Sequence, residues 1–430
     1  MINKASFSEY LDLKLAIVLL LLFSFSLGEV YRHLLAILAI AGIFLWIRHV
    51  KTLKHEPAVR LLIILFLCLW IPMLISLVDA GYIERSASAT ARFLIYPLAG
   101  ATLLYWILQP SMAKKLLWGT MGIVLFWTID GLVQFTSGYN IFGHPLYPGG
   151  RLTGMFSNWP HLGVILAVFL PVYLEGAYQL SLKSRWAWLL VLPVLIVILL
   201  GGGRSSWMLT AVALIGYCVY FFRAGRSFSW LRALSLGLTL VMVSTVTIWN
   251  VDWLSQRVNH TFGLFSGDFS LIRQATSERP PVWSTAWNMS GEHWLNGVGP
   301  RAFQYSYKEY SIMPDDPFIN APAGHPHLFL LEVAAETGLL GLIGYIVFLT
   351  ILITKIQRTV KSQYSDAVPW GLSAIVAAFP LSSTMSFYAY FSSCLIWTLI
   401  IIFIALANPL SLPIQRVIEG GRHPLETSKD

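Results

Sequence analysis

Long apolar runs recur along the whole chain, and they constrain the fold more than any other feature. The 430 residues are 56% hydrophobic and only 12% charged, which is about half the charged fraction of an ordinary soluble domain. A membrane-spanning helix needs about 20 apolar residues, or fewer where a helix is tilted. Twelve runs qualify, near 13–29, 33–48, 59–79, 89–108, 113–134, 160–178, 186–201, 206–222, 231–250, 327–353, 367–386 and 390–408. The sequence therefore predicts an all-α integral membrane protein with about twelve transmembrane helices.

Positive charge between the runs predicts which helix ends face the cytoplasm. Cytoplasmic loops of membrane proteins carry an excess of Lys and Arg. If the N-terminus is cytoplasmic, each even-numbered run is followed by basic residues. These are Arg48, Lys114 and Lys115, Lys183 and Arg185, Arg223 and Arg226, Lys355 to Lys361, and Arg416 to Arg422. We therefore expect both termini in the cytoplasm.

The opposite side carries a different set of basic residues, almost all of them Arg. They are Arg32, Arg85, Arg92, Arg151, Arg204, Arg257, Arg273, Arg279 and Arg301, with Lys308 as the one Lys. Topology does not require them, because it depletes positive charge on that side. The planar guanidinium group binds phosphate in a bidentate manner, which an ammonium group cannot do. This face is therefore expected to hold a phosphorylated ligand. Nucleic acid is not expected, because no basic soluble segment exists to bind it.

Two segments on the Arg-rich side are too long to be turns, namely 135–159 and 251–326. The second divides the chain into 1–250 with nine predicted transmembrane helices, a long loop over 251–326 on the Arg-rich side, and 327–430 with three further helices and a cytoplasmic tail. Aromatic residues at helical spacing predict amphipathic helices over 283–295 and 301–313 within the loop. We expect the loop to fold back over the membrane surface.

A histidine near the end of this loop is the strongest candidate for catalysis. In the segment GHPHLFLLEVAAETGLLGLIGY, Pro326 is expected to begin the tenth helix, because Pro suits the first helical position. His327 would then lie in the first turn, where the helix dipole disfavours an added positive charge. Its imidazole should stay neutral near pH 7 and able to accept a proton. His325 is a weaker candidate, because a residue before Pro favours extended backbone. The alternative is that His327 is an ordinary interfacial residue.

The helix that follows His327 has a predicted packing face. On a helical wheel Gly338 and Gly341 lie close to the direction of His327, and small residues allow another helix to approach. Glu332 and Glu336 are expected to project to the far side, away from His327.

Three arginines have local sequences that suit an anion. Arg204 follows three glycines in GGGRSSW, where the backbone can approach a ligand closely. Arg279 precedes a Pro pair and a predicted helix start in SERPPVWSTAW, and an Arg at a helix N-terminus is a ready anion site. Arg151, in GGRLTGMFSNWPHLG, is expected to join the same pocket. The alternative for Arg204 is contact with lipid phosphate at the membrane surface.

Other kinds of chemistry find no support in the sequence. No arrangement suits Ser-His-Asp hydrolysis, the spacing of metal ligands is absent, and no nucleotide-binding loop occurs. We therefore expect neither a metal nor a cofactor, so the energy for a reaction must arrive with the substrate.

The motifs RLTGMFSN, GGGRSS, ERPPVW with WLNGVGPRAF, and HPHLFLLEVAAETGLLG occur in this order over about residues 145–345. Together they resemble the O-antigen ligase and O-antigen polymerase superfamily, which also contains bacterial O-oligosaccharyltransferases. The resemblance implies a glycosyltransferase C-type fold in the bacterial inner membrane, with a large periplasmic loop over a cavity. It also implies transfer of a preassembled glycan from undecaprenyl pyrophosphate, on the periplasmic side, without metal or nucleotide.

By motif match, His327 takes the position of the catalytic histidine of the family, and Arg204 and Arg279 those of the essential arginines that bind the donor pyrophosphate. Three residues are additional candidates: Arg151, His325 and Arg301. One departure concerns Leu328, because the family usually has Asn, Ser or Gln directly after the catalytic histidine.

The acceptor in this superfamily is a lipid A-core sugar, another glycan chain or a protein Ser. We favour the lipid A-core, because the soluble loop is modest and no C-terminal periplasmic domain is evident. The expected partners are thus the undecaprenyl-pyrophosphate-linked glycan, the lipid A-core acceptor and membrane lipids. A lipid-linked glycan transporter is the alternative from another class. Transporters show repeated halves and ionisable residues near the midplane, whereas the ionisable residues here gather at one interface. A third reading is a metal-dependent glycosyltransferase using an early acidic residue such as Glu29.

Overall fold

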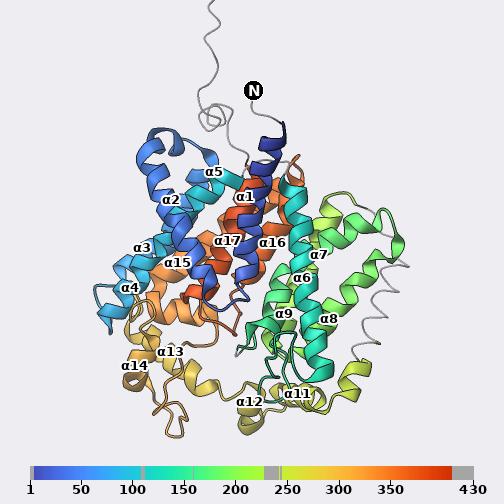
Figure 1. Cartoon of the computed structure of the whole chain (residues 1–430). Helices are drawn as coiled ribbons and strands as arrows, with labels where there is room; N and C mark the ends of the chain where they lie inside the picture. Colours follow the sequence, from blue (N-terminus) through green and yellow to red (C-terminus); the bar gives the residue numbers. More distant parts are fainter. Residues whose placement is uncertain (1–3, 108–111, 158, 227–241, 243–244, 409–430) are drawn as a thin grey trace, which may run out of the picture.

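The computed structural model describes residues 4–107, 112–157, 159–226, 242 and 245–408, whose regular structure is helical apart from two isolated β-bridges (Figure 1). The helices in the first half are α1 (Lys4–Ser24), α2 (Val30–Leu53), α3 (Pro57–Ile75), α4 (Ile83–Phe93), α5 (Ile95–Ile107), α6 (Met112–Ser137), α7 (Leu162–Ser181), α8 (Val191–Leu200) and α9 (Arg204–Arg223). Those in the second half are α11 (Asp252–Phe262), α12 (Phe269–Ala275), α13 (Pro280–Glu292), α14 (Phe303–Tyr310), α15 (Phe329–Val360), α16 (Val368–Ala377) and α17 (Tyr390–Ala407).

Seven of these helices are long and apolar enough to cross a membrane, judged by length and composition: α2, α3, α6, α7, α9, α15 and α17. The prediction of an all-α, multi-pass membrane protein is confirmed, but the number of twelve spans is not. Two shorter apolar stretches, Leu13–Ser24 and Arg185–Leu200, coincide with the first and seventh predicted spans. Most of the ninth predicted span, 231–250, and the predicted cytoplasmic tail lie outside the described residues.

Two predicted spans are interrupted helices. The fourth, 89–108, covers the end of α4 and the separate helix α5, and the eleventh, 367–386, contains only the ten-residue α16. Residues 378–389 then form a non-helical connection to α17, in which Pro380 cannot continue a helix. Much of this connection is buried, and protein contacts let irregular backbone exist at membrane depth. The prediction of one continuous eleventh helix was wrong, and the connection supplies part of the site described below.

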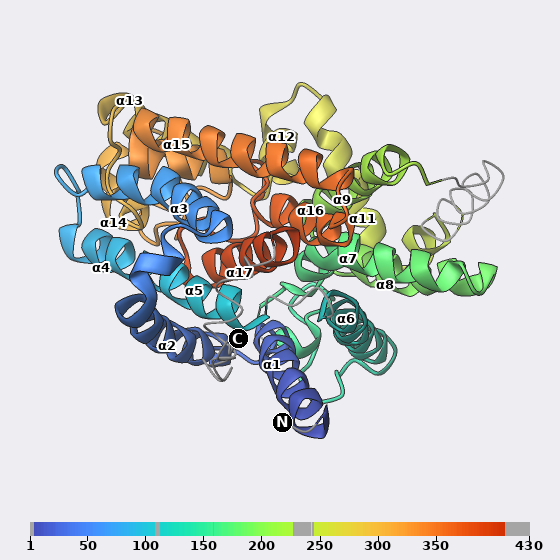
Figure 2. The same cartoon turned by 90° about the horizontal axis from the view of Figure 1, so that it is seen from above.

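Helices α7 and α17 form the centre of the molecule, and nearly all of their side chains are buried. Helix α7 packs against α6, α8, α9 and α16, whereas α17 packs against α3, α5 and α16. Figure 2 shows both helices inside the bundle, with α2, α6 and α15 around them. A helix that is apolar all round is expected in such an interior position.

Helices α11 to α14 belong to the segment 251–326, which we call the cap, and they lie together at one end of the bundle (Figure 1). We call this the cap end. Helices α13 and α14 match the two amphipathic helices predicted over 283–295 and 301–313. Their apolar residues form a small core of their own with α15, including Met289, Phe303 and Ala335.

A break in α15 attaches the cap to the bundle. Gly338 has φ 62° and ψ −159° inside the helix, a backbone conformation that is essentially restricted to glycine. The amide groups of Leu339 and Leu340 donate to the carbonyl groups of Trp294 and Leu295, at 2.8 and 3.1 Å. The prediction that Gly338 faces a neighbouring helix is therefore wrong, because a loop of the cap packs against this glycine instead. The close helix approach occurs instead at Gly344, where an added Cβ would lie 2.0 Å from a carbonyl oxygen of α3.

Candidate functional site

A cavity of about 190 Å³ lies at the cap end, where several distant segments of the chain meet. Its polar character comes from four arginines, a histidine and several hydroxyl groups. The lining residues are Arg151, Pro160, Gly203, Arg204, Ser205, Arg257, Ser277, Arg279, His327, Ser383 and Thr384. The structure thus brings together Arg151, Arg204, Arg279 and His327, which the sequence singled out separately.

Arg204 is the first residue of α9, directly after the glycine turn. Its Nη2 atom donates a hydrogen bond to Ser277 Oγ at 2.7 Å. Gly202 in the turn has φ +63°, and a Cβ there would lie 2.7 Å from the ring of Trp253. The glycine is therefore required, because it lets the turn pass close beneath the cap.

Arg279 is the N-cap residue of α13, as its position before the Pro pair predicted. Its Nη1 atom donates to Ser383 Oγ at 3.1 Å. The two preceding residues, Ser277 and Glu278, both have positive φ, near 57°. Such strained backbone is stable only where its surroundings fix it, and here it turns the chain so that Ser277 and Arg279 both line the cavity.

Arg151 and Arg257 complete what we call the first arginine cluster: Arg151, Arg204, Arg257 and Arg279. Arg151 donates from Nε to the carbonyl oxygen of Gly201 at 3.2 Å, and its guanidinium lies 5.8 Å from the ring centre of Tyr147. Arg257 belongs to α11, and its Nε atom is buried without a hydrogen-bond partner among the described residues. A buried donor without a partner is costly, so a ligand that accepts from it would be stabilised.

Among the described residues, no carboxylate lines the cavity to offset these charges. Burial, together with the positive charges of Arg257 and Arg279, lowers the pKa of Arg151 to about 10. Burial, followed by the charge of Arg257, also lowers the pKa of Arg279. Four cations held together without a counter-charge form a site that favours an anion with several oxygen atoms, such as a phosphate or diphosphate.

His327 lies at the edge of this cluster, but not in a helix as predicted. It has φ 55°, and α15 begins at Phe329, after the N-cap residue Leu328. The helix starts there because the amide groups of Phe329 and Leu330 donate to the carbonyl groups of Ser382 and Pro380, at 3.1 and 3.0 Å. The connection between α16 and α17 thus pairs amide groups that a helix start leaves unsatisfied.

The hydrogen bonds of His327 fix its tautomer. Its Nδ1 atom lies 3.1 Å from the carbonyl oxygen of Ser383, which can only accept, so Nδ1 carries the proton and Nε2 keeps a free lone pair. Burial, followed by the charge of Arg279, lowers the pKa of His327 below its ordinary value. The neutral imidazole that the sequence predicted is supported, although the cause is burial beside Arg279 and not a helix dipole.

His325 supports His327 from behind and does not line the cavity. The two rings lie 4.0 Å apart, and the backbone amide of His327 donates to His325 Nδ1 at 3.1 Å. Trp283 Nε1 donates to the carbonyl oxygen of the intervening Pro326 at 3.1 Å. Helix α13 therefore holds the His-Pro-His segment in place.

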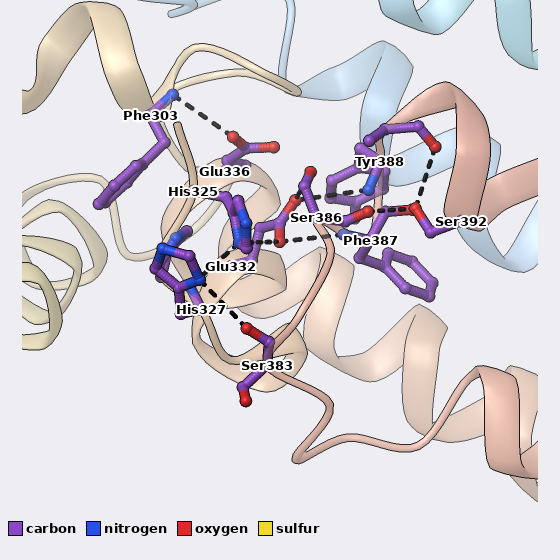
Figure 3. A network of polar contacts seen from close by, with 12 residues as sticks. Phe303, His325, His327, Glu332, Glu336, Ser383, Ser386, Phe387, Tyr388 and Ser392 are labelled. Carbon is purple, nitrogen blue, oxygen red and sulfur yellow. Dashed lines mark hydrogen bonds and ion pairs between the residues drawn. The ribbon is translucent and has the colours of Figure 1, made fainter. Parts of the chain in front are cut away.

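The prediction that both glutamates of α15 project away from His327 is wrong for Glu332 (Figure 3). Glu332 is buried, accepts from Ser386 Oγ at 2.5 Å, and has an oxygen 3.9 Å from His325 Nδ1. Glu336 is buried too and accepts from the backbone amide of Arg301 at 2.7 Å. Glu332 therefore lies beneath the histidine pair, whereas Glu336 anchors the cap.

Arg301, an additional candidate from the sequence, lies outside the cavity. Its Nη1 atom donates to Ser386 Oγ at 2.6 Å. Three lining residues, in contrast, lie outside the motifs singled out from the sequence and were missed: Arg257, Ser383 and Thr384. Arg257 was visible in the sequence only as one of the arginines on that side. The two hydroxyl residues gave no signal, because they fell in a predicted continuous helix.

Residues 188–346 match the family model described as O-antigen ligase. This domain family includes both ligases and polymerases. The chain is accordingly a multi-pass membrane enzyme of O-antigen or lipopolysaccharide glycan transfer. The matched stretch contains Arg204, Arg257, Arg279 and His327, whereas Arg151 and Ser383 come from outside it. A search of curated proteins finds no match.

Proposed function

We propose that the protein is an O-antigen ligase, which transfers a preassembled glycan from undecaprenyl pyrophosphate to a lipid A-core acceptor. The observation that carries the proposal is the cavity lined by four arginines and His327, with no carboxylate among its described lining residues. A polyprenyl pyrophosphate donor brings an anion that suits the arginines and a leaving group that needs no further activation.

In the proposed reaction, a hydroxyl oxygen of the acceptor attacks the anomeric carbon of the first donor sugar. The bond between that carbon and the pyrophosphate oxygen breaks, and undecaprenyl pyrophosphate leaves with the electron pair. Attack from the opposite side inverts the anomeric centre. The first arginine cluster would stabilise the charge that develops on the leaving group, and preorganised groups do this without reorganising during the reaction.

His327 would act as the general base in this step. Its Nε2 atom carries the free lone pair, because Nδ1–H is bound to the carbonyl oxygen of Ser383. It would accept the proton of the attacking hydroxyl, and a positioned base contributes about 10²–10⁴-fold to the rate. Burial and the charge of Arg279 favour the neutral imidazole before the reaction, whereas a bound diphosphate would offset that charge and favour the protonated product.

The test is transfer by the purified full chain in proteoliposomes, with an undecaprenyl-pyrophosphate-linked glycan and lipid A-core. We expect His327→Ala to lower transfer about 10²–10⁴-fold while donor binding is retained. His55→Ala is the matched control, because His55 is exposed and lies outside the cavity. Full activity of His327→Ala would reject the assignment.

The products of the same assay distinguish the related activities. A glycan joined to lipid A-core indicates a ligase, and elongation of the lipid-linked glycan indicates a polymerase. Movement of the intact donor across the bilayer without a new covalent product would indicate a transporter and overturn the proposal.

A further inference from the structure

Four further arginines gather at the cap end, away from the lining of the cavity, and we call them the second arginine cluster: Arg32, Arg85, Arg92 and Arg301. They come from the start of α2, both ends of α4, and the loop before α14. The positive charges of Arg85, Arg301 and Arg32 all act on the Arg92 guanidinium. Arg85 and Arg92 are seven residues apart on α4, which places them on one side of that helix.

Backbone contacts hold the Arg301 loop against α4. The amide of Gly81, just before the helix, donates to the carbonyl oxygen of Val298 at 2.9 Å. A Cβ added to Gly299 would lie 2.5 Å from Ser86 Oγ, so this loop passes directly over the residue next to Arg85. Helices α4 and α14 accordingly lie near each other in Figures 1 and 2.

The connection between α16 and α17 joins this cluster to the cavity. Ser383 binds Arg279 of the first cluster, and Ser386 binds Arg301 of the second. Three residues span at most about 11 Å, so the two clusters approach each other along this connection. Figure 3 shows Ser383 beside His327, with Ser386 farther along beside Glu332. His327 therefore lies near the first cluster, and the second cluster is a short distance away along the connection between α16 and α17.

Aromatic rings accompany the second cluster. The Arg32 guanidinium lies 5.2 Å from the ring centre of Tyr390, at the start of α17. Tyr82, just before α4, stacks on Tyr305 of α14 with ring centres 4.3 Å apart. Half-exposed tyrosines beside arginines combine an apolar ring face with polar groups.

The negative charge near the cluster is insufficient to neutralise it. Arg32 pairs with Glu29, and Arg301 is partly offset by the buried carboxyl groups of Glu332 and Glu336. Arg85 and Arg92 form no ion pair with a described acidic residue, and Arg85 Nε is buried without a partner among the described residues. This pair of guanidinium groups is thus available to an external anion.

We propose that the second arginine cluster binds a phosphate group of a glycolipid acceptor, so that the acceptor is held a short distance from the donor along the connection between α16 and α17. This inference rests on the proposed function. A transferase must hold two substrates at once, and the four arginines around the cavity are already assigned to the donor diphosphate. A second anion site a short distance along the same connection is suited to a phosphorylated acceptor, and an unphosphorylated glycan chain would have no use for it.

The test is binding of lipid A-core to the purified full chain in detergent, compared with the same lipid after enzymatic removal of its phosphate groups. The variant is Arg85→Ala/Arg92→Ala, which leaves the ion pair of Arg32 and the Ser386 contact of Arg301 intact. The control is Arg48→Ala, because Arg48 is exposed near the opposite end of α2. We expect the double variant to weaken binding of phosphorylated lipid A-core at least tenfold and binding of the dephosphorylated lipid by less than twofold.

Two further measurements separate the other outcomes. Equal binding of phosphorylated lipid A-core by the double variant and the parent would overturn the inference, and so would an equal loss for phosphatidylglycerol, which would indicate a general lipid headgroup site. Binding of inorganic pyrophosphate should be unchanged in the double variant, which also shows that it is folded. Failure of the proposed function is recognised separately, because the parent would then form no glycan–lipid A-core product.

Discussion

At the scale of single residues, the environment of His327 decides what its imidazole can do. A carbonyl group fixes the proton on Nδ1, and burial together with the nearby guanidinium of Arg279 disfavours a second proton. A general base works only in its unprotonated form, so the transfer rate falls as the pH drops through the pKa of His327. Because the pKa of His327 is lowered, this fall should occur below the ordinary histidine value of about 6.5.

We therefore predict a pH profile of transfer whose acidic decline has its midpoint below pH 6.5. Replacing Arg279 with Gln removes the neighbouring positive charge, which should raise the pKa of His327 and move the decline to higher pH. The measurement is the transfer rate at limiting donor between pH 5 and 8, which reports the pKa of the free enzyme, for parent and Arg279→Gln. A decline centred above pH 6.5 in the parent, or one that Arg279→Gln leaves in place, would contradict the role of His327.

At the scale of elements, the break of α15 at Gly338 joins the cap to the transmembrane bundle. Gly297 of the cap and Gly338 of α15 face each other's backbone, and an added Cβ would come within 2.3 and 2.4 Å of it, respectively. Ser76 at the end of α3 donates to the carbonyl groups of Asn296 and Glu336, at 2.5 and 2.7 Å. The contact between the cap, α3 and α15 thus depends on these two glycines. Helix α13 of the cap also binds the His-Pro-His segment, so a displaced cap would move that segment.

Gly338→Ala should therefore displace the cap and lower both stability and transfer. The backbone conformation alone costs roughly 1–3 kcal/mol for a residue with a Cβ, and the contact with Leu295 adds to it. The measurements are thermal unfolding in detergent and the transfer rate. Gly122→Ala is the control, because Gly122 lies within α6 and a Cβ there meets no atom within 4 Å. Equal melting temperatures for the two variants would show that the break does not support the cap.

At the scale of the whole molecule, the cap and both arginine clusters lie at one end of the helical bundle. The connection after α15 lies at the other end of that helix and contains Lys361. The distribution of Lys and Arg predicts that the cap end is periplasmic. The proposed reaction requires this orientation, because the donor glycan is used on the periplasmic side.

Single cysteines can report this orientation once the native Cys68, Cys218 and Cys394 are replaced by Ser. Ser266 is an exposed residue of the cap, and Gln363 is an exposed residue after α15. We would introduce one cysteine at each position, as Ser266→Cys and Gln363→Cys. In intact inner-membrane spheroplasts, a membrane-impermeant maleimide should label Ser266→Cys at once. It should label Gln363→Cys only after the membrane is permeabilised. The reverse pattern would place the cavity in the cytoplasm and remove the basis for the proposed function.

Local sequence signals located much of the candidate site. The glycine turn before Arg204, the Pro pair after Arg279 and the His-Pro-His segment are short patterns, and each acts on the backbone within a few residues. Arg257 and Ser383 could not be chosen in this way. Arg257 looks like any other arginine of an amphipathic helix, and Ser383 lies in a stretch whose apolar composition resembles a continuous span.

The sequence by itself determined the class of the protein, because long apolar runs must satisfy their backbone hydrogen bonds as helices in a membrane. It also determined which residue types could meet a phosphorylated ligand. Only the tertiary structure decided that the connection after α16 is not helical, and that it gathers Arg279, His327 and Arg301 along one path. The physical reason is that this connection pairs amide groups at the start of α15, a long-range hydrogen-bonding need that no local pattern of residues records.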